Sequence, residues 1–578
     1  MGRKAWPGAG AFLLLMKKLR WQILIITITL VIVGVLLVTQ EPGQQIFLPQ
    51  PASGGVYSEA LVGSISRLNP LLEQNNAPDR DVNRLLFSSL FRFDSRGLPV
   101  PDLADSWGVS QDGTIYNISI RENTFWHDGQ PVTSEDVLFT IEMIKDDSSF
   151  FPPDVRELWK NVEIRQLNER TLQFLLPEPF APFMDYLTFG IVPRHILSNT
   201  PAAEMAAAQF NLSPIGSGPY KFDRLIVENG QVAGLELSIF EQYYGGKPFI
   251  EKVIFRYFPN TQSALQAYRD GEVLAISEIS LDVLNQALAQ PALSVYSGRL
   301  PEMSMVMLNL NNPEKPFLQD EKLRHALLMG LNRQRIIDKL LLGQGIIADG
   351  PIFPGTWAFF DELERLPYDP EAATNLLKTN GYTIPAGGGT TRADKEGNPL
   401  SITLLHPDDA LHSAIAQYIF ENWSQIGVEV TLEALPYEQL VSERLSARNY
   451  DAALIDMNLA RTPDPDPYPF WHQSEAGNGQ NYGQWDNRTA SEFLEQARIN
   501  TDYTVRARLY RNFQVVFSKE LPALPLFYPV YSYAVDQQVL GVQVPPLFDT
   551  SDRFQTFQRW YLVTRRAPEA TVEIQEEE

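Results

Sequence analysis

The stretch from Leu103 to Ile144, LADSWGVSQDGTIYNISIRENTFWHDGQPVTSEDVLFTIEMI, decides the fold of this chain. The Asp-Gly pair at 112–113 indicates a tight turn, because glycine tolerates the positive φ that such turns need. Apolar and polar residues alternate over 116–121, which predicts a strand with one buried face. Thr133 and Asp136 have the spacing of a helix N-cap and its first-turn acid. Local physics therefore predicts two strands and a helix, which any large domain could contain.

The order of residue types in this stretch is more specific than its secondary structure. It resembles the signature region of extracytoplasmic solute-binding protein family 5, whose members serve peptide-, nickel- and opine-type ABC importers. The matching residues are Trp107, Ser110, Asp112, Gly113, Arg121, Phe125, His127, Asp128, Gly129, Thr133, Asp136 and Val137. Two later segments, PIGSGPYKF at 214–222 and the run from 303 to 343, resemble the family in the expected order. The resemblance covers residues 56–563.

The resemblance implies a two-lobed α/β fold like that of periplasmic binding proteins of type II, in the large form with an extra subdomain. Mixed sheets would be covered by helices, and two crossing strands would form the hinge. The first lobe is expected over 56–302, the second over 303–532, and a return to the first over 533–563.

Residue patterns also predict particular helices within these lobes. We expect a short helix over 84–93, one long helix over 316–343, and a helix that begins at Pro370 behind an Asp369 cap. Strand and helix patterns alternate over 401–457, which predicts a largely parallel or mixed sheet covered by helices.

The N-terminus carries the membrane prediction. Residues 21–39 contain no charge and are long enough to span a bilayer as a helix. The basic residues of 1–20 precede this run, so we expect that tail in the cytoplasm and the rest in the periplasm or at the cell surface. A cleaved signal peptide is the alternative, but no small-x-small cleavage site follows. Residues 40–55 predict a flexible linker, and 564–578 a disordered acidic tail.

Composition narrows the class of protein. The chain has 578 residues, a formal net charge of −23 and no cysteine. Its length predicts more than one domain, and its charge disfavours nucleic acid as a partner. The lack of cysteine excludes disulfides, thiol catalysis and the lipid-modified cysteine that tethers many members of the family.

Enzyme motifs are missing from the sequence. The six histidines form no His-Glu-x-x-His motif, and there is no Gly-x-Ser-x-Gly elbow or Walker-type loop. We therefore predict a protein that is not an enzyme, with no catalytic residue, no metal site and no cofactor.

The loop over 460–486 is the strongest candidate for ligand binding. Its prolines exclude a helix or a central strand, and it follows a predicted strand that ends near Asp456. Ligands of open α/β sheets bind beyond the carboxyl ends of strands, and aromatic rings there can stack on them. A proline-stiffened surface loop is the alternative. The predicted ligand-binding residues are Asn69, Trp357, Arg461, Asp464, Asp466, Tyr468, Trp471, Tyr482 and Trp485.

One departure from the family concerns the ligand. Members that hold a free peptide N-terminus place an acid about three residues before an Asp-Pro pair. Arg461 has that position here, or Pro463 if the count starts from Asp466. An arginine repels an ammonium group and suits a carboxylate or a hydroxyl-rich ligand.

The expected function is that of an anchored, monomeric binding protein. It would capture a peptide or similar small solute between its lobes and deliver it to the permease subunits of an ABC importer. Three alternatives remain: a tethered ligand sensor of the same fold, a binder of a non-peptide solute such as an oligosaccharide or metal chelate, and an enzyme built on this architecture.

Overall fold

The computed structural model describes residues 21, 24–35, 47–458 and 464–568. Residues 53–562 form one compact unit, and the other described residues belong to a second unit. In that second unit residues 24–35 are helical, and β1 (Phe47–Ala52) pairs antiparallel with β20 (Val563–Pro568). Parts of the predicted linker and of the predicted C-terminal tail thus form a two-stranded ribbon. Each strand finds its partner at the opposite end of the chain, which a local sequence pattern does not reveal.

The predicted membrane segment is only partly described. Its residues 22–23 and 36–39, and the whole tail 1–20, lie outside the described residues. Among the helices that are described, none has both the length and the apolar character needed to cross a bilayer.

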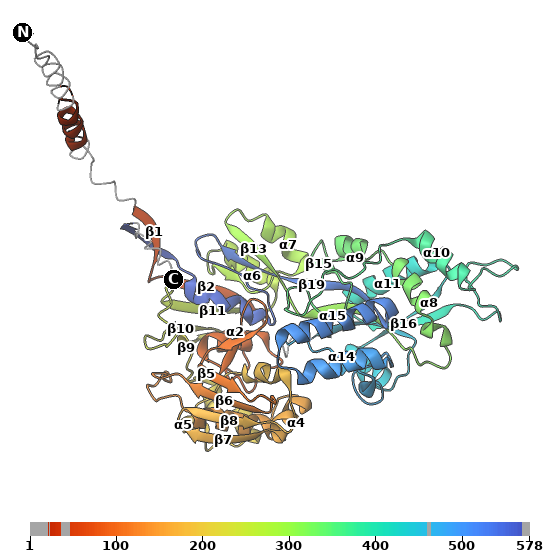
Figure 1. Cartoon of the computed structure of the whole chain (residues 1–578), viewed down its shortest axis with the longest axis horizontal. Coiled ribbons are helices and arrows are strands. Elements are labelled where there is room, and N and C mark those ends of the chain that lie inside the picture. Colours follow the sequence, from red (N-terminus) through yellow and green to blue (C-terminus); the bar gives the residue numbers. More distant parts are fainter. Residues whose placement is uncertain (1–20, 22–23, 36–46, 459–463, 569–578) are drawn as a thin grey trace, which may run out of the picture. The chain divides into compact units, whose positions relative to one another are not determined.

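A large mixed sheet runs through the compact unit in the order β17-β16-β18-β14-β19-β12-β2-β11-β10-β9, with β13 and β15 also paired to β19 (Figure 1). The first-lobe strands are β2 (Val56–Val62), β9 (Tyr220–Glu228), β10 (Gln231–Ile239), β11 (Lys252–Phe258), β12 (Ala275–Ile276) and β13 (Leu293–Arg299). Strand β2 is parallel to both β11 and β12 and is mostly buried, as expected for a strand paired on both edges. The helices of this lobe are α2 (Ala77–Leu86), α6 (Thr261–Arg269) and α7 (Leu281–Leu288).

The stretch 103–144 folds as its sequence predicts. Strands β5 (Ala104–Val109) and β6 (Ile115–Ile120) are antiparallel, and α3 (Ser134–Lys145) follows. The carboxylate of Asp136 accepts a hydrogen bond of 2.9 Å from the backbone N–H of Thr133, so the expected cap is present. A four-stranded sheet, β5-β6-β8-β7, is completed by β7 (Glu163–Asn168) and β8 (Thr171–Leu175), with α4 (Pro153–Asn161), α5 (Arg194–Leu197) and the 3₁₀ helix η1 (Ala181–Leu187) beside it.

The second lobe has the predicted mixed sheet. Strand β16 (Ser401–Pro407) is parallel to β17 (Glu429–Leu435) and β18 (Ala452–Asn458), whereas β14 (Glu302–Leu308) is antiparallel to β18. The other elements are β15 (Gly345–Ile347), α8 (Glu321–Met329), α9 (Arg333–Leu340), α10 (Pro370–Thr379), α11 (Ala410–Gln425), α12 (Tyr437–Gln439), α13 (Tyr468–Trp471), α14 (Arg488–Ile499) and α15 (Tyr503–Glu520).

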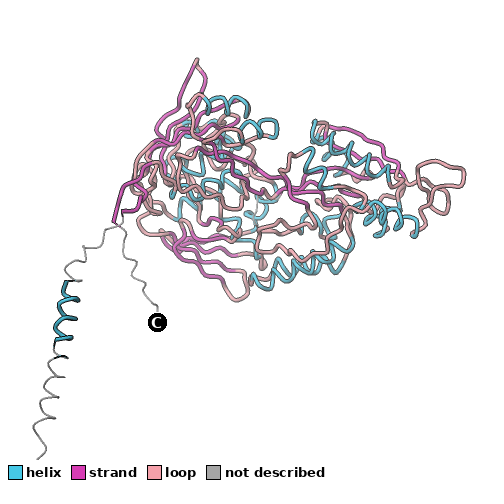
Figure 2. Tube along the Cα trace, turned by 90° about the horizontal axis from the view of Figure 1, so that it is seen from above, coloured by secondary structure: helices cyan, strands magenta, loops and turns pink. Residues whose placement is uncertain are grey.

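Strand β19 (Ala523–Asp536) belongs to both lobes. Its first half pairs with β14 and β15, and its second half pairs with β13 and β12. One apolar core is built from buried residues between Met303 and Tyr528, while two others use buried residues of 57–293 and 531–560. Figure 2 shows β19 as a long strand that runs between the two masses of the compact unit.

Two helix predictions were wrong in their bounds. The helix expected over 84–93 is α2, which begins earlier because Asn76 accepts a hydrogen bond from the Asp79 N–H and Pro78 lies in the first turn. The apolar residues after it belong instead to β3 (Phe91–Phe93), which pairs with β4 (Pro99–Pro101).

The long helix expected over 316–343 is divided into α8 and α9. The division falls at Gly330, and Asn332 starts α9 by accepting a hydrogen bond of 3.0 Å from the Arg335 N–H. The prediction for α10 is confirmed, since Asp369 accepts a hydrogen bond of 2.8 Å from the Ala372 N–H.

Candidate functional site

The two lobes contact each other where η1 of the first lobe meets α14 of the second. The guanidinium of Arg498 lies 5.9 Å from the centre of the Phe180 ring, which directly precedes η1. Charged side chains from both lobes are buried beside this contact, so we treat it as the floor of the candidate site.

Asp464 lies in this floor and is held by Arg506 of α15. The Arg506 nitrogens are 2.7 and 2.9 Å from the two Asp464 carboxylate oxygens, and both side chains are 1% exposed. Burial raises the pKa of Asp464, although the charge of Arg506 opposes this shift. Because Arg506 contacts both oxygens, this predicted ligand-binding acid is engaged within the protein.

Asp185 is a second buried acid, and it comes from η1. It is 3% exposed, and neither carboxylate oxygen has a well-aligned hydrogen-bond donor among the described residues. Burial raises its pKa well above the usual value, and the negative charge of Asp464 raises it further. Two acids from opposite lobes therefore share the single positive charge of Arg506, so this contact disfavours the state in which both acids are ionised.

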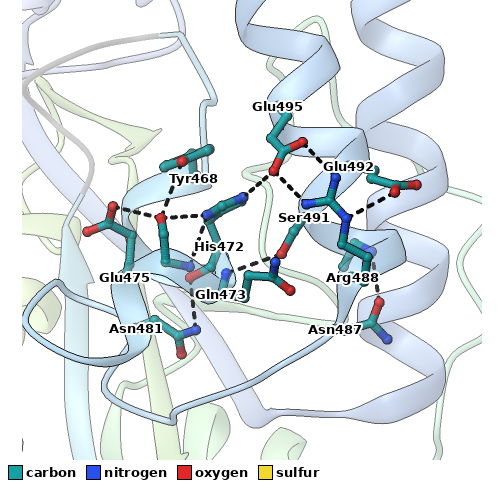
Figure 3. A network of polar contacts seen from close by, with 12 residues as sticks. Tyr468, His472, Gln473, Glu475, Asn481, Asn487, Arg488, Ser491, Glu492 and Glu495 are labelled. Atoms are coloured by element: carbon teal, nitrogen blue, oxygen red, sulfur yellow. Dashed lines mark hydrogen bonds and ion pairs between the residues drawn. The ribbon is translucent and has the colours of Figure 1, made fainter.

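Asp466 and Tyr468 are both held by Arg498. The Arg498 Nε is 2.7 Å from an Asp466 carboxylate oxygen, and the guanidinium lies 3.7 Å from the centre of the Tyr468 ring. Tyr468 in turn stacks on His472, with ring centres 4.0 Å apart. Figure 3 shows His472 between Tyr468 and Glu495, whose carboxylate is 3.0 Å from the His472 Nε2. The proline-rich loop is thus tied to α14 by a chain of polar and stacking contacts.

Trp471 and Trp485 lie in the core of the second lobe. They are 1% and 3% exposed, and both indole rings pack edge-on against Phe517 of α15. The Trp485 Nε1 donates a hydrogen bond of 2.8 Å to Glu520. In this arrangement neither ring offers a face to a solute.

The other four predicted residues lie in different settings. Asn69 is fully buried and bonds to Asn211 and to the Leu71 N–H. Trp357 is half-buried and lies 4.9 Å below the Arg506 guanidinium, beside the Asp464 pair. Tyr482 is half-buried with Arg448 over its ring, and Arg461 lies outside the described residues. The structure thus brings Trp357 to Asp464, while ligand contact by any of the nine residues stays a prediction.

A polar cluster that the sequence reasoning missed lies at the carboxyl ends of β16 and β18. The two ring nitrogens of His412 are 2.6 Å from Asp409 and 2.9 Å from Asp456, and Ser304 donates its hydroxyl to Asp456. Burial lowers the pKa of His412, but these two carboxylates outweigh it and raise the pKa above its usual value. A sequence signal was available, because Asp409 caps α11 directly after β16.

Glu302 borders this cluster where β14 enters the second lobe. Burial raises its pKa to about 7, with a further increase from Asp456 and a decrease from His412. The cluster therefore combines an imidazole whose pKa is raised with one carboxyl group, that of Glu302, which can gain or lose a proton near neutral pH. Such groups can recognise an ammonium, a hydroxyl or a carboxylate.

The two recognisable sequence motifs of the first lobe contact each other. The Nδ1 of His127 accepts a hydrogen bond of 3.1 Å from the Gly216 N–H, so its Nε2 carries the proton and donates to the Gly218 carbonyl at 3.1 Å. A Cβ on Gly216 would lie 1.8 Å from the Leu86 carbonyl oxygen, which explains the glycine. Burial lowers the pKa of His127 to about 4. Both motifs are thereby engaged in holding the first lobe together.

In the described part of the chain, His, Asp and Glu side chains form no group of three or more that could hold a metal ion. Two hydroxyl groups of the candidate site contact possible bases: Ser304 donates to the Asp456 carboxylate, and the Ser474 hydroxyl lies 2.7 Å from the His472 Nδ1.

Comparison with known proteins gives one consistent result. The model of the bacterial extracellular solute-binding proteins, family 5 (middle), matches residues 99–480. The oligopeptide-binding protein AppA of Bacillus subtilis is 25% identical over 520 residues, covering 89% of this chain and 92% of that protein. The nickel-binding periplasmic protein of Escherichia coli is 25% identical over 502 residues, covering 83% and 90%.

Solved structures agree with the sequence matches. The ABC transporter substrate-binding protein CtaP from Listeria monocytogenes is 25% identical and superposes with a TM-score of 0.73, covering 88% of this chain and 99% of that one. The two-lobed fold predicted from the sequence is confirmed.

Proposed function

The chain belongs to family 5 of the bacterial extracellular solute-binding proteins, and we propose that it captures a peptide or a similar small solute between its lobes and delivers it to an ABC importer. The relatives named for oligopeptides and for nickel support transport as the general role. We choose the cluster of His412, Asp456 and Glu302 as the site, because these polar groups lie at the edge of the second-lobe sheet where β16 and β18 have their carboxyl ends.

The chemistry of this cluster favours a ligand that offers both charge and hydrogen-bonding groups. His412 is held between two carboxylates, and Glu302 can carry or lose a proton near pH 7. Arg461, which follows β18 in the sequence, is one of the two positions, with Pro463, that correspond to the acid of members that hold a free peptide N-terminus. A peptide bound through its carboxylate, rather than through its amine, fits this combination.

Closure of the lobes would bury the ligand. The lobes already contact each other at Asp185, Asp464 and Arg506, and Trp357 stands beside that contact. Trp357 is half-buried, so its ring remains partly accessible beside this contact, whereas the Tyr468 ring is already covered by Arg498 and His472.

The membrane anchor is a separate part of the proposal. Residues 21–39 are uncharged and follow a basic tail, which supports an uncleaved helix that places the binding unit outside the cytoplasm. Extraction of membranes with alkaline carbonate should leave the full chain in the pellet, and N-terminal sequencing should find residues before 39. If the mature protein instead began near residue 40, residues 21–39 would belong to a cleaved signal peptide and not to an anchor.

The ligand can be identified from the protein itself. The full chain, purified in mild detergent, would be denatured and its released solutes analysed by mass spectrometry. We expect a peptide or another small polar solute, recovered unchanged after incubation with fresh protein. Conversion of that solute into a product would identify an enzyme instead.

The site is tested by substitution in the same preparation. His412→Ala should weaken binding of the identified solute about tenfold or more, which corresponds to loss of a charged hydrogen bond. His195→Ala is the matched control, because His195 also contacts an aspartate, Asp128, but lies in the first lobe in α5. Equal affinity of His412→Ala and the unaltered protein would remove this cluster from the site.

A further inference from the structure

A cavity lies entirely within the first lobe. Its volume is about 760 Å³, and its walls come from residues 84–121, 219–245 and 543–559. No residue of 303–532 lines it, and neither His412 nor Asp464 contributes to it. This cavity is therefore separate from the candidate site and does not depend on the proposed function.

Positive charge is concentrated at this cavity in a chain whose net charge is −23. Four arginines line it, namely Arg84, Arg92, Arg121 and Arg559, against two acids, Asp94 and Asp102. Arg84 contacts Asp552 at 3.0 Å. Arg92 and Arg559 are exposed and form no ion pair with any described residue.

The two acids of the cavity have hydrogen-bond partners other than its four arginines, although Asp102 also interacts electrostatically with Arg92 and Arg84. Asp94 forms an ion pair of 3.0 Å with Arg96, which is not one of the four arginines of the cavity. Asp102 accepts hydrogen bonds from the Tyr244 hydroxyl at 2.6 Å and from the Ser89 N–H at 3.2 Å. With four arginines against these two acids, the lining carries an excess of positive charge.

Arg121 is held in place by neutral groups. Its Nε donates a hydrogen bond of 2.6 Å to the Asp102 carbonyl, and its guanidinium lies 6.0 Å from the centre of the Tyr244 ring. The nearest carboxylate, that of the exposed Asp105, is 3.8 Å away. Arginine has five N–H donors, so this one retains donors for a ligand.

The remaining walls can hold an apolar or ring-shaped body. Tyr243 and Tyr244 lie with ring centres 4.5 Å apart, and Phe87, Phe557 and two adjacent prolines, 545–546, also line the cavity. The volume falls within the range of small-molecule sites.

We propose that this first-lobe cavity binds an organic anion, with its phosphate or carboxylate contacted by Arg92, Arg121 and Arg559 and its body placed against Tyr243 and Tyr244. The planar guanidinium forms paired hydrogen bonds with both kinds of oxyanion. A sugar that carries a phosphate or a carboxylate has the required combination of charge, hydroxyls and ring.

Calorimetric titration of the full chain in detergent tests this site. The probes are glucose 6-phosphate and glucuronate, with glucose as the neutral match. We expect at least one of the two anions to bind with a dissociation constant of about 1 mM or below, and glucose not to bind. Added salt should weaken the binding. No binding by either anion, or equal binding of glucose, would overturn the proposal.

Paired variants locate the bound anion. The double substitution Arg92→Gln with Arg559→Gln should weaken anion binding about tenfold or more while leaving thermal unfolding unchanged, because both side chains are exposed. The control Arg165→Gln with Arg170→Gln removes the same charge from exposed arginines on the β7–β8 hairpin and should have little effect.

His412→Ala separates this proposal from the proposed function. It should leave anion binding in the first-lobe cavity unchanged, whatever it does to the solute of the cleft. If His412→Ala abolished binding of the anion while the Arg92 and Arg559 pair did not, the anion would bind in the cleft and the second site would be wrong.

Discussion

Asp464 and Arg506 form an ion pair in which both side chains are 1% exposed and two guanidinium nitrogens contact the two carboxylate oxygens. The sequence places these residues 42 positions apart, on a loop and on the helix α15. Since Arg506 also donates to the Ala497 carbonyl at 2.9 Å, the pair fixes the proline-rich loop to the end of α14 as well.

Asp464→Asn should therefore lower stability before it affects any ligand. It leaves the Arg506 charge buried without a full partner, and loss of one member of a buried pair costs about 3–5 kcal/mol. The loss in the free energy of unfolding can be measured by urea unfolding. Asp466→Asn is the control, because its partner Arg498 is 28% exposed and the loss should be smaller. Equal losses in the two variants would contradict the structural role of Asp464.

Asp185→Asn should stabilise the protein at neutral pH. Burial and the charge of Asp464 raise the pKa of Asp185, so the folded state binds a proton that the unfolded state does not. Stability then falls as pH rises above the unfolded value near 3.8, and a neutral amide escapes this loss. The gain in melting temperature over the unaltered protein should grow from pH 4 to pH 7. A gain that is constant with pH would argue against a titrating Asp185.

His127→Gln should remove a pH dependence of the opposite sign. The pKa of His127 in the folded state is about 4, below its unfolded value of 6.5, so the unfolded state binds more protons between these limits. The contribution of His127 is present above pH 6.5 and is lost as pH falls to 4, by up to about 3 kcal/mol. Denaturant unfolding from pH 6.5 to pH 4 should show a smaller decrease in the free energy of unfolding for the variant than for the unaltered protein. Parallel curves would contradict the burial of a neutral His127.

Gly216→Ala should disrupt the first lobe. The new Cβ would lie 1.8 Å from the Leu86 carbonyl oxygen, and backbone has little freedom to move there, so we expect a loss of about 3 kcal/mol or more. Gly108→Ala is the control, because no heavy atom lies within 4 Å of the corresponding Cβ. Thermal unfolding of both variants provides the measurement, and a mild effect at Gly216 would contradict the packing described.

Trp471→Ala should destabilise the second lobe rather than act on a ligand alone. The indole ring is 1% exposed and lies 4.8 Å from the Phe517 ring, and removal of a buried tryptophan costs about 3–5 kcal/mol. Trp471→Phe should recover part of the loss. If Trp471→Ala kept full stability but lost solute binding, Trp471 would have to face the cleft when the solute is bound.

Local sequence predicted what is decided locally. The hairpin and helix of 103–144 and the cap at Asp369 were predicted correctly, because turn glycines and capping acids act within a few residues. The break at Gly330 was missed, since the apolar face of the predicted helix continues through it. The strand β1 was missed because its stability comes from β20 at the other end of the chain.

The candidate site was harder to predict for the same reason. Aromatic residues in a proline-rich loop suggested stacking surfaces, yet Trp471 and Trp485 pack against Phe517 of a helix that follows later. The residues next to Asp464 in the sequence gave no indication that it pairs with Arg506, which lies 42 positions later. His412 could have been found, since it follows a strand by only a few residues and lies beyond a capping Asp409.

The position of β19 also bears on the order in which the protein can be made. During synthesis from the N-terminus, residues 523–536 emerge after almost all of the other strands, yet β19 is the central strand between β14 and β12. Until then β14 and β12 each keep one unpaired edge and β13 lacks its partner strand, which exposes sheet edges that favour aggregation. Neither lobe can complete its sheet alone, so a chain released before residue 523 should remain a client of chaperones and proteases, and both lobes should reach their native state in one late step.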